Sequence, residues 1–553
     1  MNHTLFKNPP LAFRPVQRAV DLKPTPGLTP TMPYRSLTHA EMARLKELGF
    51  GGVVLSVNYH EYLDNESYWQ ELCGDLEKLR QLGMRVWIRD ERGRPSGKAA
   101  GKVVARYPAG QARGLAYVAW PVEGARVCEM PIPKGRVVFA GALRWEGDHL
   151  SLEGLLRTNP IAQQGMLSVP LPHGRWLIVA FVERLLTEGT FAHDPQSGTE
   201  PYINILDESA VRTFTSIAYD AYGEHVGSYL GTLIDGFHTD EPMLITTAFP
   251  VESEFPPYPV IPWAEDLPHL FVERYHYDLV SHLPALFNNI GDRTAQVRCD
   301  FYRLIGERCG QAYTQILSAW CRAHGVKLKH QPLCEESLVT HTAFNGSLFS
   351  FLAPADTLCS DLLSTTVETF KSRDQCLPAM KLVSSVAHVH RRSDVIADFA
   401  DAYQYRVGIT TSCEQIRAAI NWMFGLGANA LHALWAWRER DAQEWQHLND
   451  YAARLAVMLR GGTHIADLAL LYPITTVWAH YVPTTEFLMK PPIGSLERPK
   501  IWSETYAAEA SAWERPLREL VWTLLEHQRD FDVVDDAALA NSRITAGAIG
   551  MGN

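Results

Sequence analysis

Two pairs of adjacent acidic residues each follow an apolar run with the length of a β-strand. The run that ends at residue 239 is followed by Asp240 and Glu241, and the run that ends at residue 89 is followed by Asp90 and Glu91. The carboxyl ends of parallel strands in a closed barrel meet at one mouth, where active sites are built. Carboxylates gathered there are typical of enzymes that cleave glycosidic bonds, so the two pairs predict one acidic mouth.

Cleavage of a glycosidic bond needs a proton donor for the leaving oxygen and a carboxylate across the sugar, which activates water or attacks carbon. We predict Glu241 as the donor, because the neighbouring charge of Asp240 favours the protonated form of its carboxyl group. Two partners are open: Asp398 at the end of a later run, or one of Glu335 and Glu336. An aspartate is about 1.5 Å shorter than a glutamate, so Asp398 would lie further from Glu241. A wider gap favours an inverting enzyme, in which the two carboxyl groups are about 6.5–9.5 Å apart.

Other residues are candidates for holding the sugar. Sugar hydroxyls are oriented by charged hydrogen-bonding groups, and sugar rings stack on aromatic faces. The residues expected to contact a substrate in this way are Asp90, Glu91, Asp240, Glu335, Asp356 and Trp435. Structural roles are open as well, since Asp90 and Glu91 have arginines nearby in the sequence with which they could pair, and Trp435 could pack in the core.

A repeating pattern of apolar strands and amphipathic helices positions these residues. It begins near residue 36 and implies parallel βα units. Thr38 and Glu41 have capping-box spacing at the start of the first helix, and Asp207 is expected to cap a later one. Strands are predicted at 53–57, 86–88, 231–242, 326–330, 356–359, 395–399 and 428–434. With an N-terminal strand they make eight, the number that closes a (β/α)8 barrel.

The pattern divides the chain into four parts. Residues 1–114 form the first part of the barrel, and 191–460 form its remainder with the catalytic mouth. Between them, 115–190 has short alternating runs separated by Pro and Gly turns, which predicts a small inserted antiparallel β module. Residues 461–553 begin a flavodoxin-like α/β domain, in which 466–473 is expected to be a buried strand. Since only two strands are predicted there, too few for a stable sheet, we expect this domain to be truncated.

Composition narrows the class of partner. The formal net charge of -11 argues against a nucleic acid or an anionic membrane as partner, and no apolar run reaches the roughly 18 residues that span a bilayer. No secretory signal is visible, and the nine cysteines are scattered without a CxxC pair, so reduced thiols and a cytoplasmic location are expected. The absence of HExxH or His-rich spacing predicts no zinc and no cofactor, and composition leaves the oligomeric state open.

Short motifs occur in a fixed order between roughly residues 45 and 460. They are Gly51-Gly52-Val53-Val54, Asn58-Tyr59, Tyr62-Leu63, Trp87-Ile88, Asp90-Glu91, Pro95-Ser96-Gly97, Pro201-Tyr202-Ile203-Asn204-Ile205-Leu206-Asp207, Thr239-Asp240-Glu241-Pro242, Trp320-Cys321, His324-Gly325, His330, Glu335-Glu336, Lys381-Leu382, Ser384-Ser385 and Ala387-His388. This ordered series resembles glycoside hydrolase family 106, the α-L-rhamnosidase-like glycosidases. The resemblance implies a catalytic (β/α)8 barrel with an inserted β module and a following flavodoxin-like domain. It also adds His330 to the substrate ligands and makes a calcium ion conceivable, whereas His238 and His388 are expected to be structural.

The chain departs from the family's pattern near the predicted mouth. Arg94 stands where an aromatic residue is usual before Pro-Ser-Gly, Lys329 stands where Gly is usual before His330, and Asp398 stands where Glu is usual. The Pro-Gly-Ile-Asp signature of the sixth strand is reduced to Pro354-Ala355-Asp356.

The favoured interpretation is an inverting glycosidase that acts on an oligosaccharide or glycoside with a terminal deoxy- or related sugar such as α-L-rhamnose. Two alternatives are open: an inactive sugar-binding or remnant barrel, and a retaining β-galactosidase-like glycosidase. A salt bridge from Arg94 or Lys329 that plugs the mouth would favour the inactive barrel. A carboxylate separation near about 5 Å would favour the retaining enzyme.

Overall fold

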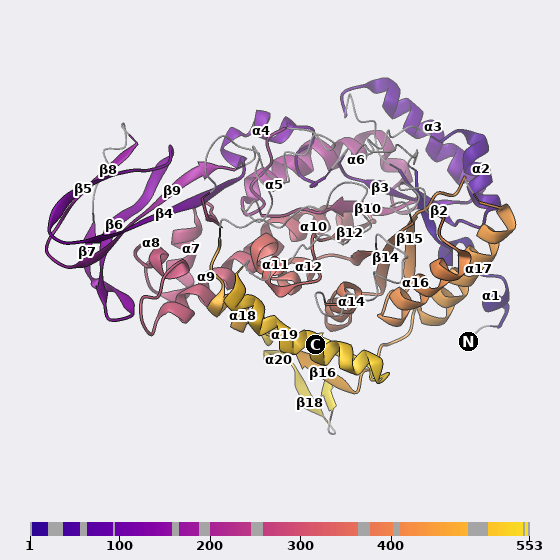
Figure 1. The fold of residues 1–553 in the computed structure, drawn as a ribbon. Coiled ribbons are helices and arrows are strands. Elements are labelled where there is room, and N and C mark those ends of the chain that lie inside the picture. The colour runs from indigo at the N-terminus through magenta and orange to yellow at the C-terminus, as the bar shows by residue number, and fades with distance from the viewer. Residues whose placement is uncertain are drawn as a thin grey trace.

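The centre of the molecule is a closed barrel of eight parallel strands surrounded by helices (Figure 1). A computed structural model describes residues 3–19, 37–55, 63–91, 94–157, 165–186, 200–244, 258–362, 377–401, 410–438, 440–484, 507–545 and 548–550. The barrel strands in chain order are β1 (Val16–Arg18), β2 (Gly52–Leu55), β3 (Arg85–Arg89), β10 (Ile234–Asp240), β12 (Lys327–Gln331), β13 (Thr357–Leu362), β14 (Asp394–Ala400) and β15 (Ala430–Leu434). Since β15 pairs with β1, the ring closes, and the predicted (β/α)8 barrel with its N-terminal strand is confirmed.

Helices form the outer layer of the barrel. Those between successive strands include α2 (His39–Glu47), α3 (Glu66–Leu82), α5 (Glu208–Phe214), η5 (Thr215–Tyr219), α6 (Asp220–Val226), α9 (Thr294–Cys309), η8 (Gly310–Gln315), α10 (Ile316–Ala323), α11 (Leu338–Asn345), α12 (Leu348–Leu352), α14 (Ala379–Val389) and α16 (Cys413–Gly425), and α17 (Ala442–Leu459) follows the last strand. Shorter helical segments are α1 (His3–Lys7), η1 (Leu11–Phe13), α4 (Lys102–Arg106), η2 (Pro108–Gly110), η6 (Gly227–Tyr229), α7 (Leu267–Tyr275), α8 (Leu279–His282) and η7 (Leu283–Leu286). The predicted caps are confirmed: Thr38 and Glu41 form a capping box on α2, and the Asp207 side chain accepts two backbone N–H groups at the start of α5.

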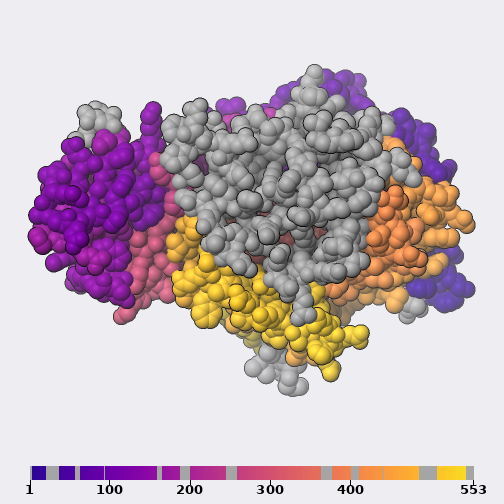
Figure 2. Space-filling model, viewed as in Figure 1, coloured from indigo at the N-terminus to yellow at the C-terminus, as the bar shows by residue number. Residues whose placement is uncertain are grey.

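An antiparallel β module is inserted between β3 and β10. Its main sheet has the order β11 (Val260–Pro262), β4 (Arg113–Glu123), β9 (Arg175–Leu185), β6 (Arg136–Glu146) and β7 (His149–Arg157). A two-stranded sheet of β5 (Arg126–Pro131) and β8 (Met166–Leu171) packs with it around a separate apolar core. The module lies at one end of the molecule, in purple in Figures 1 and 2. Strand β11 lies outside the predicted bounds of the module. The chain first forms the barrel strand β10 and then returns to the module, where β11 pairs with β4.

The C-terminal segment packs across one side of the barrel, in yellow in Figure 2. It contains β16 (Leu468–Leu471), α18 (Ile474–His480), α19 (Ala508–Glu526), β17 (Phe531–Val534), α20 (Asp536–Ala540), β18 (Arg543–Thr545) and β19 (Ala548–Gly550). Strands β16 and β17 pair in parallel, as in the opening of an α/β domain. The prediction of a buried strand at 466–473 is wrong in burial, because Leu468 and Leu471 are 41% and 49% exposed.

The helices of the described residues give no candidate for a membrane span, since none combines sufficient length with sufficient apolar character.

Candidate active site

The register of the barrel strands decides which side chains point into the barrel. Successive side chains of a strand face opposite sides. One interior layer is apolar and consists of Val16, Val54, Trp87, Cys359, Ile396 and Ala430. Further along the strands, toward their carboxyl ends, the interior side chains of the described residues are polar. We call this polar end the mouth; it contains Arg18, Arg89, His238, Asp240, Lys329, Gln331, Asp361, Asp398 and His432.

Asp398 on β14 is held by two cations inside the barrel. Its Oδ2 lies 2.5 Å from Arg18 Nη2 and 2.8 Å from Lys329 Nζ. Burial opposes ionisation of this carboxyl group, but the charges of Arg18 and Lys329 outweigh it and hold the pKa of Asp398 well below its usual range. The candidate partner carboxylate is therefore ionised and already paired.

Asp240 ends β10 and is also ion-paired. It contacts Arg89, the last residue of β3, and its backbone N–H donates to Ser96 Oγ at 2.8 Å. Ser96 in turn donates its own backbone N–H to the Asp240 carbonyl oxygen at 2.9 Å. Burial opposes ionisation, yet the surrounding cations, Arg89 foremost, lower the pKa of Asp240. Ser96 of the Pro-Ser-Gly motif thus ties the loop after β3 to the end of β10.

Glu241 follows β10 in a left-handed backbone conformation, with φ of 53°. This backbone conformation is strained for a non-glycine residue, and residues strained in this way are concentrated at functional sites. Its Oε1 lies 3.2 Å from Arg94 Nη1, and its Oε2 is buried with no hydrogen-bond partner among the described residues. Burial raises the pKa of Glu241; Arg94 opposes the rise and the adjacent Asp240 adds to it.

Three further acids lie beside Glu241, and from here on Glu241, Glu335 and Glu336 are counted with the acids of the mouth. Glu335 is buried, and Glu336 and Asp361 are half-buried. Burial raises the pKa of Asp361 well above its usual range, and the charges of Glu336 and Glu241 raise it further. The pKa of Glu335 is raised in the same way, by burial and then by Asp361 and Glu336. The charges of Glu336, Glu241, Asp398 and Asp240 all act on Asp361, and those of Asp361, Glu336 and Glu241 act on Glu335, so these acids lie near one another. Their catalytic and binding roles stay predictions.

Asp361 is the acid that sequence reasoning missed. The predicted strand 356–359 ends before Asp361, and the residue predicted as a substrate ligand on this strand is Asp356, from the reduced signature Pro354-Ala355-Asp356. In the structure Asp361 lies near the carboxyl end of β13, in register with Asp398, and accepts a hydrogen bond from Gln331 Nε2 at 3.2 Å. Asp356 precedes the strand at the opposite end of the barrel, where it pairs with Arg322 at 2.6 Å. The structure therefore does not bring Asp356 to the mouth, because strand direction separates the two ends.

Two other candidates point away from the mouth. His330 faces the helix layer: its Nδ1 lies 3.2 Å from Thr314 Oγ1, and its ring packs edge-on against Phe351. Burial lowers the pKa of His330 to about 3, so the ring is neutral. Trp435 is buried and stacks on Trp445, with ring centroids 4.8 Å apart. Both side chains pack between the barrel strands and the surrounding helices.

Asp90 and Glu91 support the loop after β3. Asp90 accepts hydrogen bonds from Ser96 Oγ and Tyr219 Oη, each at 2.7 Å, on the helix side of the barrel. Burial raises its pKa to about 7, against the lowering effect of these two donors. The Glu91 carboxylate accepts the Ala99 backbone N–H at 2.6 Å. Neither side chain is placed with the acids of the mouth, and the motif residues Asn58, Tyr59 and Tyr62 lie outside the described residues.

The acids of the mouth do not form a compact cation site. Within the described part of the chain, the one group of three or more ligand-type residues whose atoms all lie within 4.8 Å of one another is His388, His464 and Asp532, outside the barrel. Oxygen donors from Glu335, Glu336 and Asp361 are of the type calcium prefers, but their spacing does not meet this limit. Among the described residues, the acids of the mouth therefore give no group of this kind for the calcium ion that the resemblance made conceivable.

The barrel and its acidic mouth define a (β/α)8 protein with its polar site at the carboxyl ends of the strands. No protein-family model and no curated protein matches the chain. Among solved structures, a rhamnosidase from Novosphingobium sp. PP1Y matches with a TM-score of 0.55 and 12% identity, over 86% of this chain and 62% of the rhamnosidase. The chain thus spans less than two thirds of that protein's length, and at this identity the similarity shows a shared fold.

Two more distant matches have TM-scores below 0.5. They are alpha-L-fucosidase isoenzyme 2 from Paenibacillus thiaminolyticus, with a TM-score of 0.40 and 12% identity over 95% of this chain and 58% of that one, and the PgaB (BpsB) glycoside hydrolase domain from Bordetella bronchiseptica, with a TM-score of 0.35 and 11% identity over 74% and 91%.

Proposed function

We propose that this protein is a glycoside hydrolase in which Glu241 protonates the leaving oxygen. The observation that carries the proposal is the state of the Glu241 carboxyl group. It is buried at the end of β10, its pKa is raised, and its Oε2 has no hydrogen-bond partner among the described residues. A carboxyl group that keeps its proton and can present it to a bound substrate is what a general acid requires.

The second carboxylate in this proposal is Glu336. A base that activates water must be reachable by water, and Glu336 is half-buried beside Glu335 and Asp361. Asp398 is ionised, but both of its cations would have to be displaced before it could attack carbon or bind water. We therefore assign Asp398 the role of positioning Arg18 and Lys329 beneath the sugar.

The proposed substrate is a glycoside with a terminal deoxysugar, α-L-rhamnose first. Support comes from the ordered motifs in the sequence and from the fold shared with the rhamnosidase. We propose inversion at the anomeric carbon, with water activated by Glu336. Proton NMR of the first product formed tests this step, because inversion of an α-L-rhamnoside yields the β-anomer first. Early appearance of the α-anomer would support the retaining alternative.

Hydrolysis of aryl glycosides by the wild type and by Glu241→Gln tests the proposed acid. For a phenyl α-L-rhamnoside, we expect kcat to fall about 10²–10⁴-fold in the variant. For a 2,4-dinitrophenyl rhamnoside the loss should be much smaller, because this leaving group departs without a proton. Glu183→Gln is the matched control, since Glu183 is a buried acid paired with Arg113 and Arg136 in the inserted module. Equal losses on both substrates would contradict the assignment of Glu241.

A second candidate, an inactive sugar-binding barrel, is favoured by one observation. Arg94 contacts Glu241 at 3.2 Å and Lys329 contacts Asp398 at 2.8 Å, so two of the residues at which the chain departs from the resemblance pair with a candidate catalytic acid. Binding of L-rhamnose measured by calorimetry, together with no turnover of any glycoside by folded protein, would support this candidate.

A further inference from the structure

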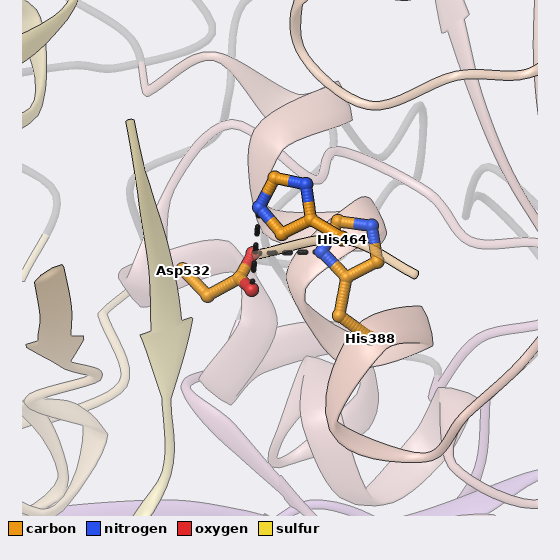
Figure 3. Close-up of side chains that lie close together, drawn as sticks. All are labelled: His388, His464 and Asp532. Atoms are coloured by element: carbon orange, nitrogen blue, oxygen red, sulfur yellow. Dashed lines mark hydrogen bonds and ion pairs between the residues drawn. The ribbon is translucent and has the colours of Figure 1, made fainter. Parts of the chain in front are cut away.

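A cluster of two histidines and an aspartate lies outside the barrel, where the C-terminal segment packs against it (Figure 3). His388 belongs to α14, His464 lies in the connection between α17 and β16, and Asp532 belongs to β17. Their ligand-type nitrogen and oxygen atoms all lie within 4.8 Å of one another. Three segments far apart in the sequence thus present metal-ligand atoms to one point.

The contacts within the cluster leave donor atoms available. His388 Nδ1 lies 2.8 Å from Asp532 Oδ1, and His464 Nε2 lies 3.5 Å from Asp532 Oδ2. His464 Nε2 is buried and also lies 3.5 Å from Asp530 Oδ2, but neither of these two carboxylate contacts is a hydrogen bond, and it has none with the other described residues. A buried imidazole nitrogen without a partner loses the hydrogen bond that water would give it, and a bound cation would restore an equivalent interaction.

We propose that His388, His464 and Asp532 bind one divalent transition-metal ion of the zinc class, which fastens β17 to α14. Two imidazole nitrogens and one carboxylate oxygen form a donor set that Zn²⁺ takes in proteins, with a fourth position left for water. Mg²⁺ and Ca²⁺ prefer sets made entirely of oxygen. The half-buried position of all three residues leaves access for the ion.

Two features of the cluster must change when the ion binds. The two imidazole rings stack with centroids 4.0 Å apart and an interplanar angle of 12°, so they lie nearly parallel to each other. One ring must therefore tilt, and His464, which is in neither a helix nor a strand, is the one free to do so. Lys381 Nζ lies 3.7 Å from Asp532 Oδ1, but it is closer to Asp530, at 3.0 Å. Asp530 therefore holds the ammonium group while Asp532 turns toward the ion.

Calorimetric titration of the full chain with Zn²⁺, after removal of bound metal with EDTA and dialysis, tests the proposal. We expect one equivalent to bind to the wild type and to the control His447→Ala, whose histidine is exposed on α17. His464→Ala should bind more than about tenfold more weakly, since even an outer-sphere partner is worth 10–100-fold in metal affinity. Ca²⁺ and Mg²⁺ should give no heat that depends on His464.

Thermal unfolding provides a second readout that does not depend on heats of binding. Because the site joins two parts of the folded chain, Zn²⁺ should raise the Tm of the wild type and of His447→Ala, and leave the Tm of His464→Ala unchanged. Circular dichroism before the titration checks that each variant is folded. Absence of Zn²⁺ binding by the wild type, or equal affinity in His464→Ala and wild type, would overturn the proposal.

Discussion

The acids of one barrel have pKa values that are shifted in opposite directions by what surrounds each of them. Asp240 and Asp398 lie against arginine or lysine and have lowered pKa values, whereas Glu241, Glu335 and Asp361 have raised values because burial dominates. Opposite shifts within one site favour the protonated form of some acids and the charged form of others. The positions of the charged groups around each acid therefore distinguish the acids of the mouth from one another, which their residue types alone do not.

Asp90 gives a test of this effect on stability. The unfolded pKa of an aspartate is about 3.9, and the folded value is about 7. A raised folded pKa stabilises the fold below the unfolded pKa, and that contribution is lost as pH rises through the folded pKa. Asp90→Asn removes the titration, so its stability relative to wild type should increase between pH 5 and pH 8, on the order of 1–3 kcal/mol.

Urea unfolding at pH 5, 6, 7 and 8 measures this difference. Asp148→Asn serves as the control, because the Asp148 side chain is 94% exposed. A constant offset between Asp90→Asn and wild type at all four values would contradict the raised pKa of Asp90.

At the scale of elements, closure of the barrel depends on a close approach between β10 and its neighbours. A Cβ on Gly236 would lie 2.2 Å from the Lys327 carbonyl oxygen of β12 and 2.5 Å from the Trp87 ring of β3. Both contacts are far inside van der Waals distance, and the Lys327 atom is backbone, which cannot rotate away. A glycine at this point lets β10 sit between its two partners and carry Asp240 and Glu241 to the mouth.

Gly236→Ala should therefore destabilise the protein by about 1–3 kcal/mol, the usual cost of overpacking. The urea unfolding midpoint measures the change. Gly227→Ala is the matched control, since nothing lies within 4 Å of its added Cβ, and we expect its effect to stay within about 0.5 kcal/mol. Equal midpoints for the two variants would show that the strands can move apart freely.

At the scale of the whole molecule, a buried side chain of the C-terminal segment contacts the start of the helix that follows Glu335 and Glu336. Glu514 on α19 accepts hydrogen bonds from Ser337 Oγ at 2.6 Å and from the Leu338 backbone N–H at 2.8 Å. These residues begin α11, directly after Glu335 and Glu336. A carboxylate at a helix N-terminus satisfies otherwise unpaired N–H groups and interacts favourably with the helix dipole.

Glu514→Ala leaves the two donors buried without their acceptor, so we expect a loss of roughly 1–3 kcal/mol. Hydrogen exchange followed by mass spectrometry should show faster exchange across residues 333–345, while the inserted module is unaffected. Glu519→Ala on the exposed face of α19 is the control. Unchanged exchange in 333–345 would mean that the C-terminal segment does not hold this loop.

Local patterns in the sequence determined the eight barrel strands, the capped helices and the inserted module, because strand and helix periodicity and cap chemistry act over a few residues. They also placed Glu241 and Asp398 at strand ends.

Tertiary structure decided the rest. It placed Asp361 at the mouth and Asp356 at the far end, since a misjudged strand end moves an acid by the length of the barrel. It turned His330 toward the helices, because alternate residues of a strand face opposite ways, and it brought His388, His464 and Asp532 together from segments that no local pattern connects.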